Sequence, residues 1–298
     1  MTPSSPSPLT PPPPIPTMPA VPTDFPRPDD APPEGKAARF AELGAGRPAR
    51  VVAVTSGKGG VGKTFVSANL AAALSRRGLR VLVLDADLGL ANLDVVLNLA
   101  PQRTLHDVFT GGSVLEEALL PAPGGFTVLL AGSGLVEYSR LTPDLREQLF
   151  GVIEQVRPLF DVVLLDTGAG ISDVVLYTIS LADEVLVVAT PEPTALTDAY
   201  ATLKVLAHQQ HRERLGLVIN QVARSGDGRA IAAQLQAVVD RYVLPMTGHP
   251  VQLQLIGDIP ADPAVREAVQ RRELLIERLP GSPAAQAFGP LARRLAPD

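Results

Sequence analysis

The chain has 298 residues, with 26 Lys and Arg, 31 Asp and Glu, and no Cys. This length allows one large α/β domain or two small ones, and a hydrophobic fraction of 46% is ordinary for a chain with a sizeable core. The absence of Cys excludes disulfides, thiolate zinc sites, cysteine nucleophiles and iron–sulfur clusters held by cysteine. The net charge of −5 disfavours a protein that coats nucleic acid with its whole surface.

The N-terminal segment is rich in proline, since residues 1–33 hold 14 of the chain's 30 prolines. Proline lacks a backbone N–H and fixes φ, so we expect residues 1–47 to form a disordered, partly polyproline tail with a short helix near 36–44. A docking ligand for a proline-binding partner is the alternative. Residues 48–298 are expected to form a single domain. The sequence shows neither a secretory signal pattern nor a long apolar stretch, which favours a cytoplasmic location.

From residue 50 onward, short apolar runs rich in β-branched residues alternate with helical stretches. Runs that are almost continuously apolar indicate strands buried on both faces, and the helices between them predict a doubly wound, mostly parallel α/β sheet. The runs are 50–55, 80–85, 126–130, 161–166, 184–190, 215–220 and 252–256. One helix is predicted to start at Pro143 with Thr142 as its N-cap. Its apolar stripe consists of Leu145, Leu149, Val152, Ile153 and Val156.

The segment Gly57–Thr64, GKGGVGKT, fits the phosphate-loop pattern G-x-x-x-x-G-K-[ST] at every position. It lies between a predicted strand and an apolar helix, where backbone N–H groups and the helix dipole can hold phosphate oxygens. Lys63 is expected to neutralise the β- and γ-phosphates, and the Thr64 hydroxyl to bind Mg²⁺. A glycine-rich turn without a ligand is the alternative. The predicted nucleotide-binding residues are Gly57, Lys58, Gly59, Gly60, Val61, Gly62, Lys63, Thr64 and Phe65.

Two of the predicted strands end in Asp, at LDAD (84–87) and at LDTGAG (165–170). Parallel strands end at one edge of a sheet, which is where ligands bind in this fold class. Asp166 is expected to hold Mg²⁺ through water, while Gly168 lets the backbone approach a γ-phosphate. The alternative is that Asp85, Asp87 and Asp166 only cap the helices that follow.

Together these motifs resemble the MinD/ParA family of ATPases with a deviant Walker A motif, in which Lys58 is the extra lysine. The segment 85–94, DADLGLANLD, looks like the family's switch I, and 166–172, DTGAGIS, looks like its switch II. The resemblance covers about residues 48–298. It is greatest to the FlhG branch, MinD-like regulators of flagellar number and placement, in the segments 167–172 and 190–206.

The resemblance implies a switch in which two subunits dimerise around ATP and Mg²⁺ and separate after slow hydrolysis. In that family Lys58 would reach the partner's nucleotide and Asp87 would orient the attacking water, so the expected catalytic residues are Asp87, Lys58 and Lys63. Asp85 would help to fix Mg²⁺ beside Thr64 and Asp166. Asn220 would read adenine, with the backbone of 259–262 closing over the base. The sequence lacks the guanine-reading pattern N-K-x-D, which favours ATP over GTP.

The partner is less defined, because FlhG proteins stimulate the GTPase FlhF through an N-terminal D-Q-A-x-x-L-R motif. Only Ala37 of the aligned segment 35–41 matches that motif strictly. Two alternatives for the partner therefore stay open: a FlhF-like GTPase, or a protein of another system that acts at the cell pole or in partitioning. Two further readings are a ParA-type ATPase that partitions DNA and a metabolic ATP-dependent ligase or amidotransferase. The scattered arginine clusters 76–80, 212–214 and 271–272 favour solvated helix ends over DNA binding.

Two other segments allow two interpretations each. Near the C-terminus, an apolar helical face lies beside two arginines, and it forms either the last core helix or a weak contact with the inner face of the cell membrane. The face consists of Phe288, Leu291, Ala292 and Leu295. The segment 191–200 is either a helix start, with Thr194 as N-cap and Asp198 in the first turn, or a contact for a partner.

Overall fold

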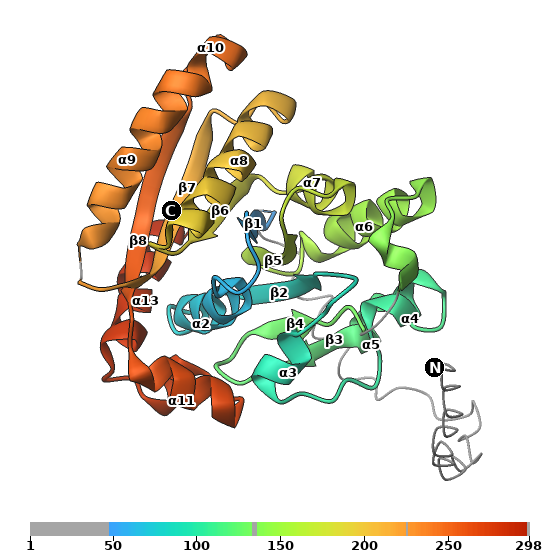
Figure 1. Cartoon of the computed structure of the whole chain (residues 1–298). Helices are drawn as coiled ribbons and strands as arrows, with labels where there is room; N and C mark the ends of the chain where they lie inside the picture. The colour runs from blue at the N-terminus through green and yellow to red at the C-terminus, as the bar shows by residue number, and fades with distance from the viewer. Residues whose placement is uncertain (1–47, 133–135, 225, 297–298) are drawn as a thin grey trace, which may run out of the picture. The chain divides into compact units, whose positions relative to one another are not determined.

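The computed structural model describes residues 48–132, 136–224 and 226–296, and Figure 1 shows their arrangement. The predicted tail 1–47 and the helix near 36–44 lie outside the described residues. The strands of the described part are β1 Arg50–Ser56, β2 Val81–Ala86, β3 Leu119–Pro121, β4 Thr127–Leu129, β5 Val162–Ala169, β6 Glu184–Ala189, β7 Arg214–Val222 and β8 Gln252–Pro260.

These strands form one sheet in the order β3-β4-β2-β5-β1-β6-β7-β8. Every neighbouring pair is parallel except β3 and β4, which are antiparallel. β2 is buried along its whole length, as the continuous apolar run predicted. The predicted doubly wound, mostly parallel α/β sheet is confirmed. β8 differs from the prediction of burial on both faces, because it forms an edge of the sheet and two of its residues, Gln252 and Gln254, are exposed.

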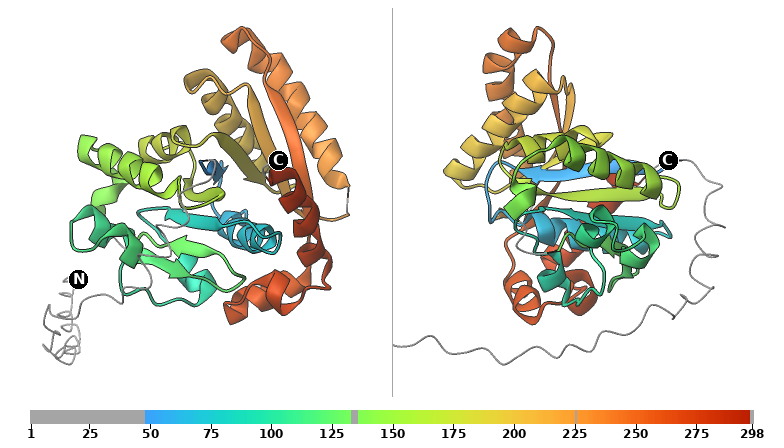
Figure 2. Two further views of the ribbon diagram at one scale, coloured as in Figure 1. Left: turned by 180° about the vertical axis from the view of Figure 1, so that it is seen from behind. Right: turned by 90° about the vertical axis from the view of Figure 1, so that its right-hand side faces the viewer.

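Helices cover both faces of the sheet, as Figures 1 and 2 show. Successive residues of β1 point to opposite faces, so Val51 and Ala53 enter one core and Val52 and Val54 the other. The first core contains residues of α4 Leu105–Phe109, α5 Leu115–Ala118, α6 Pro143–Val156, α7 Asp173–Ser180, α8 Pro193–Gln209 and α9 Asp227–Tyr242. The second contains residues of α2 Lys63–Ser75, α3 Leu93–Leu97, α11 Pro263–Arg271, α12 Leu275–Arg278 and α13 Pro283–Leu295.

Two short elements complete the described part, a 3-10 turn at Val136–Ser139 and α10 at Leu244–Thr247. Helix α6 begins at Pro143, and the Thr142 hydroxyl accepts a hydrogen bond from the N–H of Leu145 at 3.1 Å. The predicted cap and the predicted apolar stripe of this helix are both confirmed, since the five stripe residues are its buried ones.

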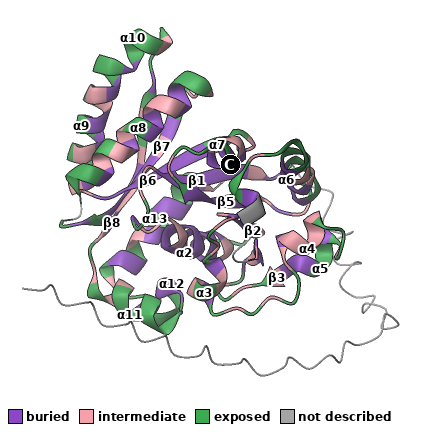
Figure 3. Ribbon diagram, turned by 45° about the vertical axis from the view of Figure 1, so that its right-hand side comes forward, coloured by how far each residue is buried: buried purple, intermediate pink, exposed green. Residues whose placement is uncertain are grey.

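The apolar face of α13 is part of the core and is not free to contact lipid. Phe288 and Leu291 are each only 1% exposed, and the helix packs on α2 and β8. Of the two predicted alternatives, the structure therefore supports a core helix and not a membrane contact through this face, and Figure 3 shows buried residues along α13. Proline 290 lies within the helix. Among the described residues, no helix is both long and apolar enough to cross a bilayer.

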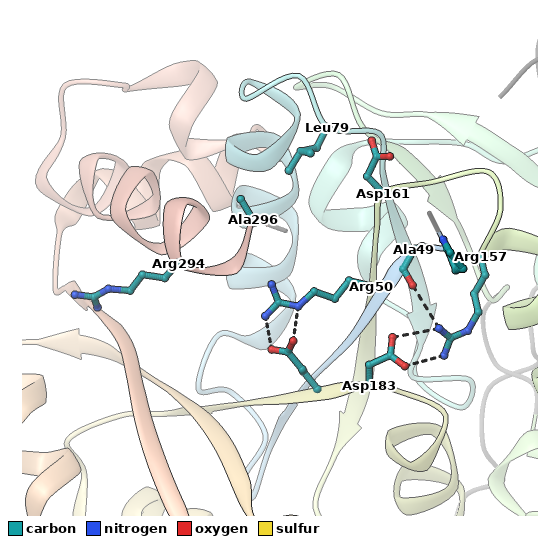
Figure 4. A pocket seen from close by; sticks show the side chains of 10 residues that line it. Ala49, Arg50, Leu79, Arg157, Asp161, Asp183, Arg294 and Ala296 are labelled. Atoms are coloured by element: carbon teal, nitrogen blue, oxygen red, sulfur yellow. Dashed lines mark hydrogen bonds and ion pairs between the residues drawn. The ribbon is translucent and has the colours of Figure 1, made fainter. Parts of the chain in front are cut away.

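A hollow of about 840 Å³ opens at the amino edge of the sheet, on the side away from the phosphate loop. Ion pairs line it, as Figure 4 shows: Arg50 pairs with Glu184, and Arg157 binds Asp183 at 3.1 Å. Because these charges neutralise one another, the hollow offers an anionic ligand little unbalanced charge. The predicted nucleotide residues lie at the opposite, carboxyl edge.

Candidate nucleotide site

The phosphate loop connects the carboxyl end of β1 to the start of α2, as the sequence predicted. Two glycines fix its position. A Cβ on Gly57 would lie 2.1 Å from the backbone oxygen of Asp198, so the loop passes directly against the second turn of α8. The prediction that Asp198 lies in the first turn is wrong, because α8 begins at Pro193. Gly62 has φ +92° and caps α2, and a Cβ there would meet the Asn220 side chain at 2.5 Å. The loop therefore requires glycine at both positions.

The outer side of the loop is open. Gly59 and Gly60 are exposed, and added Cβ atoms at either position would meet nothing within 4 Å. Val61 and Phe65 are buried and anchor the loop from below, with the Phe65 ring meeting that of Phe288 edge-on at 5.7 Å. The loop thus presents its backbone to solvent at the N-terminus of α2, the geometry that suits phosphate oxygens.

The two Asp-terminated strands lie side by side, since Asp85 of β2 and Asp166 of β5 are paired in the sheet register. Both side chains are almost fully buried, at 1% and 2% exposure. The Ser67 hydroxyl of α2 donates a hydrogen bond to Asp166 Oδ1 at 2.9 Å. The nearby Thr64 side chain lowers the pKa of Asp166. The carboxylate predicted for magnesium therefore lies near the predicted hydroxyl ligand.

Burial sets the ionisation of this cluster. It raises the pKa of Asp166 to about 6, against the hydrogen bonds from Thr64 and Ser67 and the charge of Lys63. It raises the pKa of Asp85 to about 8, and the neighbouring Asp166 charge adds to the rise. Burial lowers the pKa of Lys63, although the charges of Asp166 and Asp87 oppose that change. The Lys63 ammonium group therefore interacts with two carboxyl groups, those of Asp166 and Asp87.

Asp85 organises the segment that follows β2. Its Oδ1 accepts the N–H of Asp87 at 3.3 Å and its Oδ2 accepts the N–H of Leu93 at 3.2 Å. Asp87 itself is half-buried, and its Oδ1 lies 3.3 Å from the position of a Cβ on Gly168. The structure thus brings Asp87 next to the carboxyl end of β5. The magnesium role of Asp85 stays a prediction.

Lys58 turns toward the start of α8. Its Nζ lies 3.0 Å from Thr194 Oγ1 and 3.5 Å from Glu192 Oε2, and its side chain is 41% exposed. The expected N-cap at Thr194 is wrong, because α8 begins at Pro193 with Glu192 in the cap position and no side-chain cap bond. Proline at the first helical position starts the helix earlier, which frees the Thr194 hydroxyl for Lys58.

Asn220 lies at the end of β7 and is 4% exposed. Its Nδ2 donates to the carbonyl oxygen of Val61 at 2.8 Å, and its Oδ1 accepts the N–H of Gln221 at 3.0 Å. It therefore joins β7 to the phosphate loop. Asp262, at the end of the predicted base-covering segment, caps α11 by accepting the N–H of Ala264 at 2.9 Å. The adenine-reading role of Asn220 stays a prediction.

The donors at this edge suit magnesium rather than a softer metal. They are a hydroxyl and carboxylates, which are hard oxygen ligands. No cluster of three or more His, Cys, Asp or Glu within the described ranges could hold a metal ion alone. The residues therefore fit Mg²⁺ that arrives with a nucleotide, whose phosphates and water supply the other ligands. Thr64 and Asp166 are the residues that would hold it.

Sequence reasoning did not identify Ser67, Glu192 or Thr194 as parts of this site. Ser67 carried a signal, because it lies about one helical turn after Thr64 and is one of two polar residues, with Asn69, in a mostly apolar stretch. Glu192 and Thr194 are far from Lys58 in sequence, so only the fold shows that they meet.

Comparison with known proteins gives a consistent relationship. Antiactivator FleN of Pseudomonas aeruginosa is 42% identical over 254 residues, covering 85% of this chain and 89% of that protein. The flagellum site-determining protein YlxH of Helicobacter pylori is 32% identical, covering 82% and 80%. The solved structure of the septum site-determining protein MinD of Pyrococcus horikoshii, complexed with Mg-ADP, has a TM-score of 0.67 at 29% identity, covering 83% of this chain and 96% of that one.

The family model described as the CobQ/CobB/MinD/ParA nucleotide binding domain matches residues 52–276. This range contains the phosphate loop, both Asp-terminated strands and Asn220. Fold, motif and overall similarity agree, and we conclude that the chain belongs to the MinD/ParA family of nucleotide-binding proteins.

Proposed function

We propose that this protein is an ATPase that binds ATP with Mg²⁺, forms a homodimer in the ATP state and separates after hydrolysis. We further propose that this switch controls the number or placement of a cellular structure such as flagella. The observation that carries the proposal is the meeting of a complete phosphate loop with Asp87, Asp166 and the exposed Lys58 at one edge of the sheet. The relatives FleN and YlxH support the cellular role.

Each residue has a distinct part in the proposed reaction. The loop N–H groups and Lys63 bind the phosphates, and Asp166 with Thr64 orients the metal. Bound Mg²⁺ would neutralise charge that develops on the phosphoryl oxygens. Asp87 lies beside the carboxyl end of β5, where it can hold the attacking water. Lys58 leaves Thr194 and Glu192 and supplies a cation to the partner's nucleotide, as an arginine finger does.

The test is the mass of an Asp87→Ala protein, measured by size-exclusion chromatography with light scattering. Without the water-positioning carboxylate the variant should bind ATP but hydrolyse it slowly. We therefore expect a monomer with Mg-ADP and a stable dimer with Mg-ATP. A monomer in both states would overturn the dimer switch, and normal hydrolysis would overturn the role of Asp87.

The matched control is Lys63→Ala, which removes the cation nearest the expected phosphates. We expect it to lose nucleotide binding and stay monomeric in every nucleotide. A Lys63→Ala protein that still dimerises with Mg-ATP would show that dimerisation does not depend on the phosphate loop.

The cellular role requires a genetic test. We expect the protein in the cytoplasm, acting through a FlhF-like GTPase or another partner. Deleting the gene in a flagellated host should change the number or position of flagella seen by electron microscopy, and the Asp87→Ala gene should fail to restore them. Unchanged flagella, with DNA that no longer segregates evenly, would favour a partitioning role.

A further inference from the structure

We propose that a hollow between the end of α2 and the helices α12 and α13 is a docking site for an acidic peptide segment of a partner protein, one that carries a bulky apolar side chain. We call it the α2–α13 hollow. Its volume is about 320 Å³. Its rim includes Arg76, Arg77 and Arg293, and its floor includes Ile276, Ala285 and Phe288. It lies on a helical face that the proposed nucleotide reaction does not use.

The rim holds positive charge that the protein does not neutralise. Arg76 is engaged, because its Nη2 binds Glu277 Oε1 at 2.6 Å and the carbonyl oxygen of Ile276 at 2.9 Å. Arg77 and Arg293 are exposed, and neither has an ion pair or a side-chain hydrogen bond within the ranges that the structure describes. Two guanidinium groups are therefore available to carboxylates, with which they form strong bidentate pairs.

The surrounding face is basic in an acidic protein. The segment 263–296, which forms α11, α12 and α13, contains six Arg and three Glu, whereas the whole chain has a net charge of −5. Arg76 and Arg77 add to this face, because α13 packs on α2. Such local asymmetry attracts an acidic segment and speeds its association.

The floor is apolar and recessed. Phe288, Ile276 and Ala285 are 1%, 3% and 6% exposed, so they can receive an apolar group but cannot insert into one. A bilayer needs apolar side chains that protrude, and on α2, α11, α12 and α13 only Val269 is a large exposed one among the described residues. The guest must therefore supply the protruding apolar side chain.

Nucleic acid fits this surface less well than a peptide does. A phosphate backbone binds through a series of cations, each of which releases counterions. The α2–α13 hollow offers two unengaged arginines around an apolar floor instead. An apolar anchor surrounded by charge-assisted pairs is the arrangement typical of peptide recognition.

The experiment selects random short peptides on the full-length protein by display, and measures the affinity of the selected peptides by fluorescence anisotropy. We expect enrichment of peptides that combine Asp or Glu with Leu, Ile or Phe. The first test variant reverses two charges, Arg77→Glu with Arg293→Glu. Its matched control, Arg229→Glu with Arg241→Glu, makes the same charge change on α9, which packs on the other face of the sheet.

A second variant blocks the hollow without changing charge. Gly289 is exposed in α13, a Cβ there meets no atom within 4 Å except Arg293 Nη1 at 3.8 Å, and leucine favours a helix over glycine. Gly289→Leu should therefore fold and fill part of the hollow. Both test variants should weaken peptide binding at least about tenfold, the loss of one good charged or apolar anchor, while the α9 control changes little.

Three outcomes would overturn the proposal. The first is a selection without acidic, apolar peptides. The second is peptide binding that neither test variant weakens although each still binds nucleotide. The third is that no peptide binds, whereas anionic vesicles or duplex DNA bind the wild type and not the double arginine variant. That result would assign the face to a lipid or to nucleic acid.

Discussion

Ser67 illustrates how a residue that touches no ligand can prepare a metal site. Its hydroxyl holds Asp166 Oδ1 at 2.9 Å inside the protein. The hydrogen bond opposes the rise in the pKa of Asp166 that burial causes. Ser67 is therefore a positioning residue for the carboxylate that we assign to Mg²⁺.

Replacing Ser67 with Ala should weaken the response to magnesium. A hydrogen bond to a charged group contributes about 1.5 kcal/mol or more, so half-saturating Mg²⁺ should rise roughly tenfold. The measurement is the Mg²⁺ dependence of ATP hydrolysis and of nucleotide affinity. Ser75→Ala is the matched control, because this hydroxyl of the same helix has no hydrogen-bond partner within the described residues. Loss of thermal stability with an unchanged Mg²⁺ response would show that Ser67 is only structural.

Some residues of the site could be predicted from the local sequence, whereas others have contacts that only the tertiary structure creates. The phosphate loop could be predicted because its residues are contiguous in the sequence and its glycines are required by the backbone conformation of the loop. The partners of Lys58 could not, since Glu192 and Thr194 approach it only through the packing of α8 against the loop. The two hydrogen bonds that Asp85 accepts from backbone N–H groups were not predicted either, because the sequence analysis considered Asp85 only as a metal ligand or a helix cap.

Among the secondary structure elements, β2 and β5 are fastened together where both begin. Asp161, just before β5, accepts the N–H of Arg80 at 2.8 Å and binds its guanidinium at 2.7 Å. The Arg80 hydrogen bonds lower the pKa of Asp161. The connection aligns two strands whose other ends carry Asp85 and Asp166, so it supports the register of the site.

Asp161→Asn should destabilise the protein by about 1 kcal/mol at neutral pH, a modest value because the pair is partly exposed. The folded-state pKa lies below the unfolded value of about 4. The stabilisation is therefore complete above that value and is lost as pH falls through the folded pKa. Thermal melts should show a wild-type advantage at pH 7 that shrinks in acid. The role would be contradicted if the wild type stayed more stable than Asp161→Asn at a pH at which Asp161 is protonated. It would also be contradicted if Asp161→Asn lost no more stability than the exposed control Glu147→Gln.

Helices and strands whose own residues carry a cap, a turn signal and a regular apolar pattern were predicted well, and the others were not. The cap, the proline and the apolar stripe of α6 agree with one another, so its start was correct. β3 has only three residues and is a strand because it pairs with β4 in antiparallel fashion. No pattern within its own sequence predicts that pairing. The face of α13 could be assigned only after β8 and α2 were seen against it, because an amphipathic pattern does not say what it covers.

Across the molecule, the two edges of the sheet differ in how their charges are balanced. The amino edge pairs its charges internally, as Arg50 does with Glu184 and Arg157 with Asp183. At the carboxyl edge Lys63 interacts with the charges of Asp166 and Asp87, and Lys58 is held only by exposed contacts. Exposed ion pairs are weak, so Lys58 can move to another anion at little cost. The amino edge therefore keeps its charges paired within the protein, whereas the carboxyl edge leaves Lys58 available for the proposed contact with a partner.

Lys58→Ala should separate nucleotide binding from assembly. Lys63 and the loop N–H groups stay in place, so nucleotide affinity should change little, whereas dimerisation with Mg-ATP and hydrolysis should both be lost. Fluorescent nucleotide titration and light scattering measure the two properties on one sample. Lys204→Ala, on α8, removes an equal charge away from the loop and should behave as wild type. If Lys58→Ala loses nucleotide affinity as completely as Lys63→Ala, then Lys58 serves its own subunit's phosphates and the proposed action across the dimer fails.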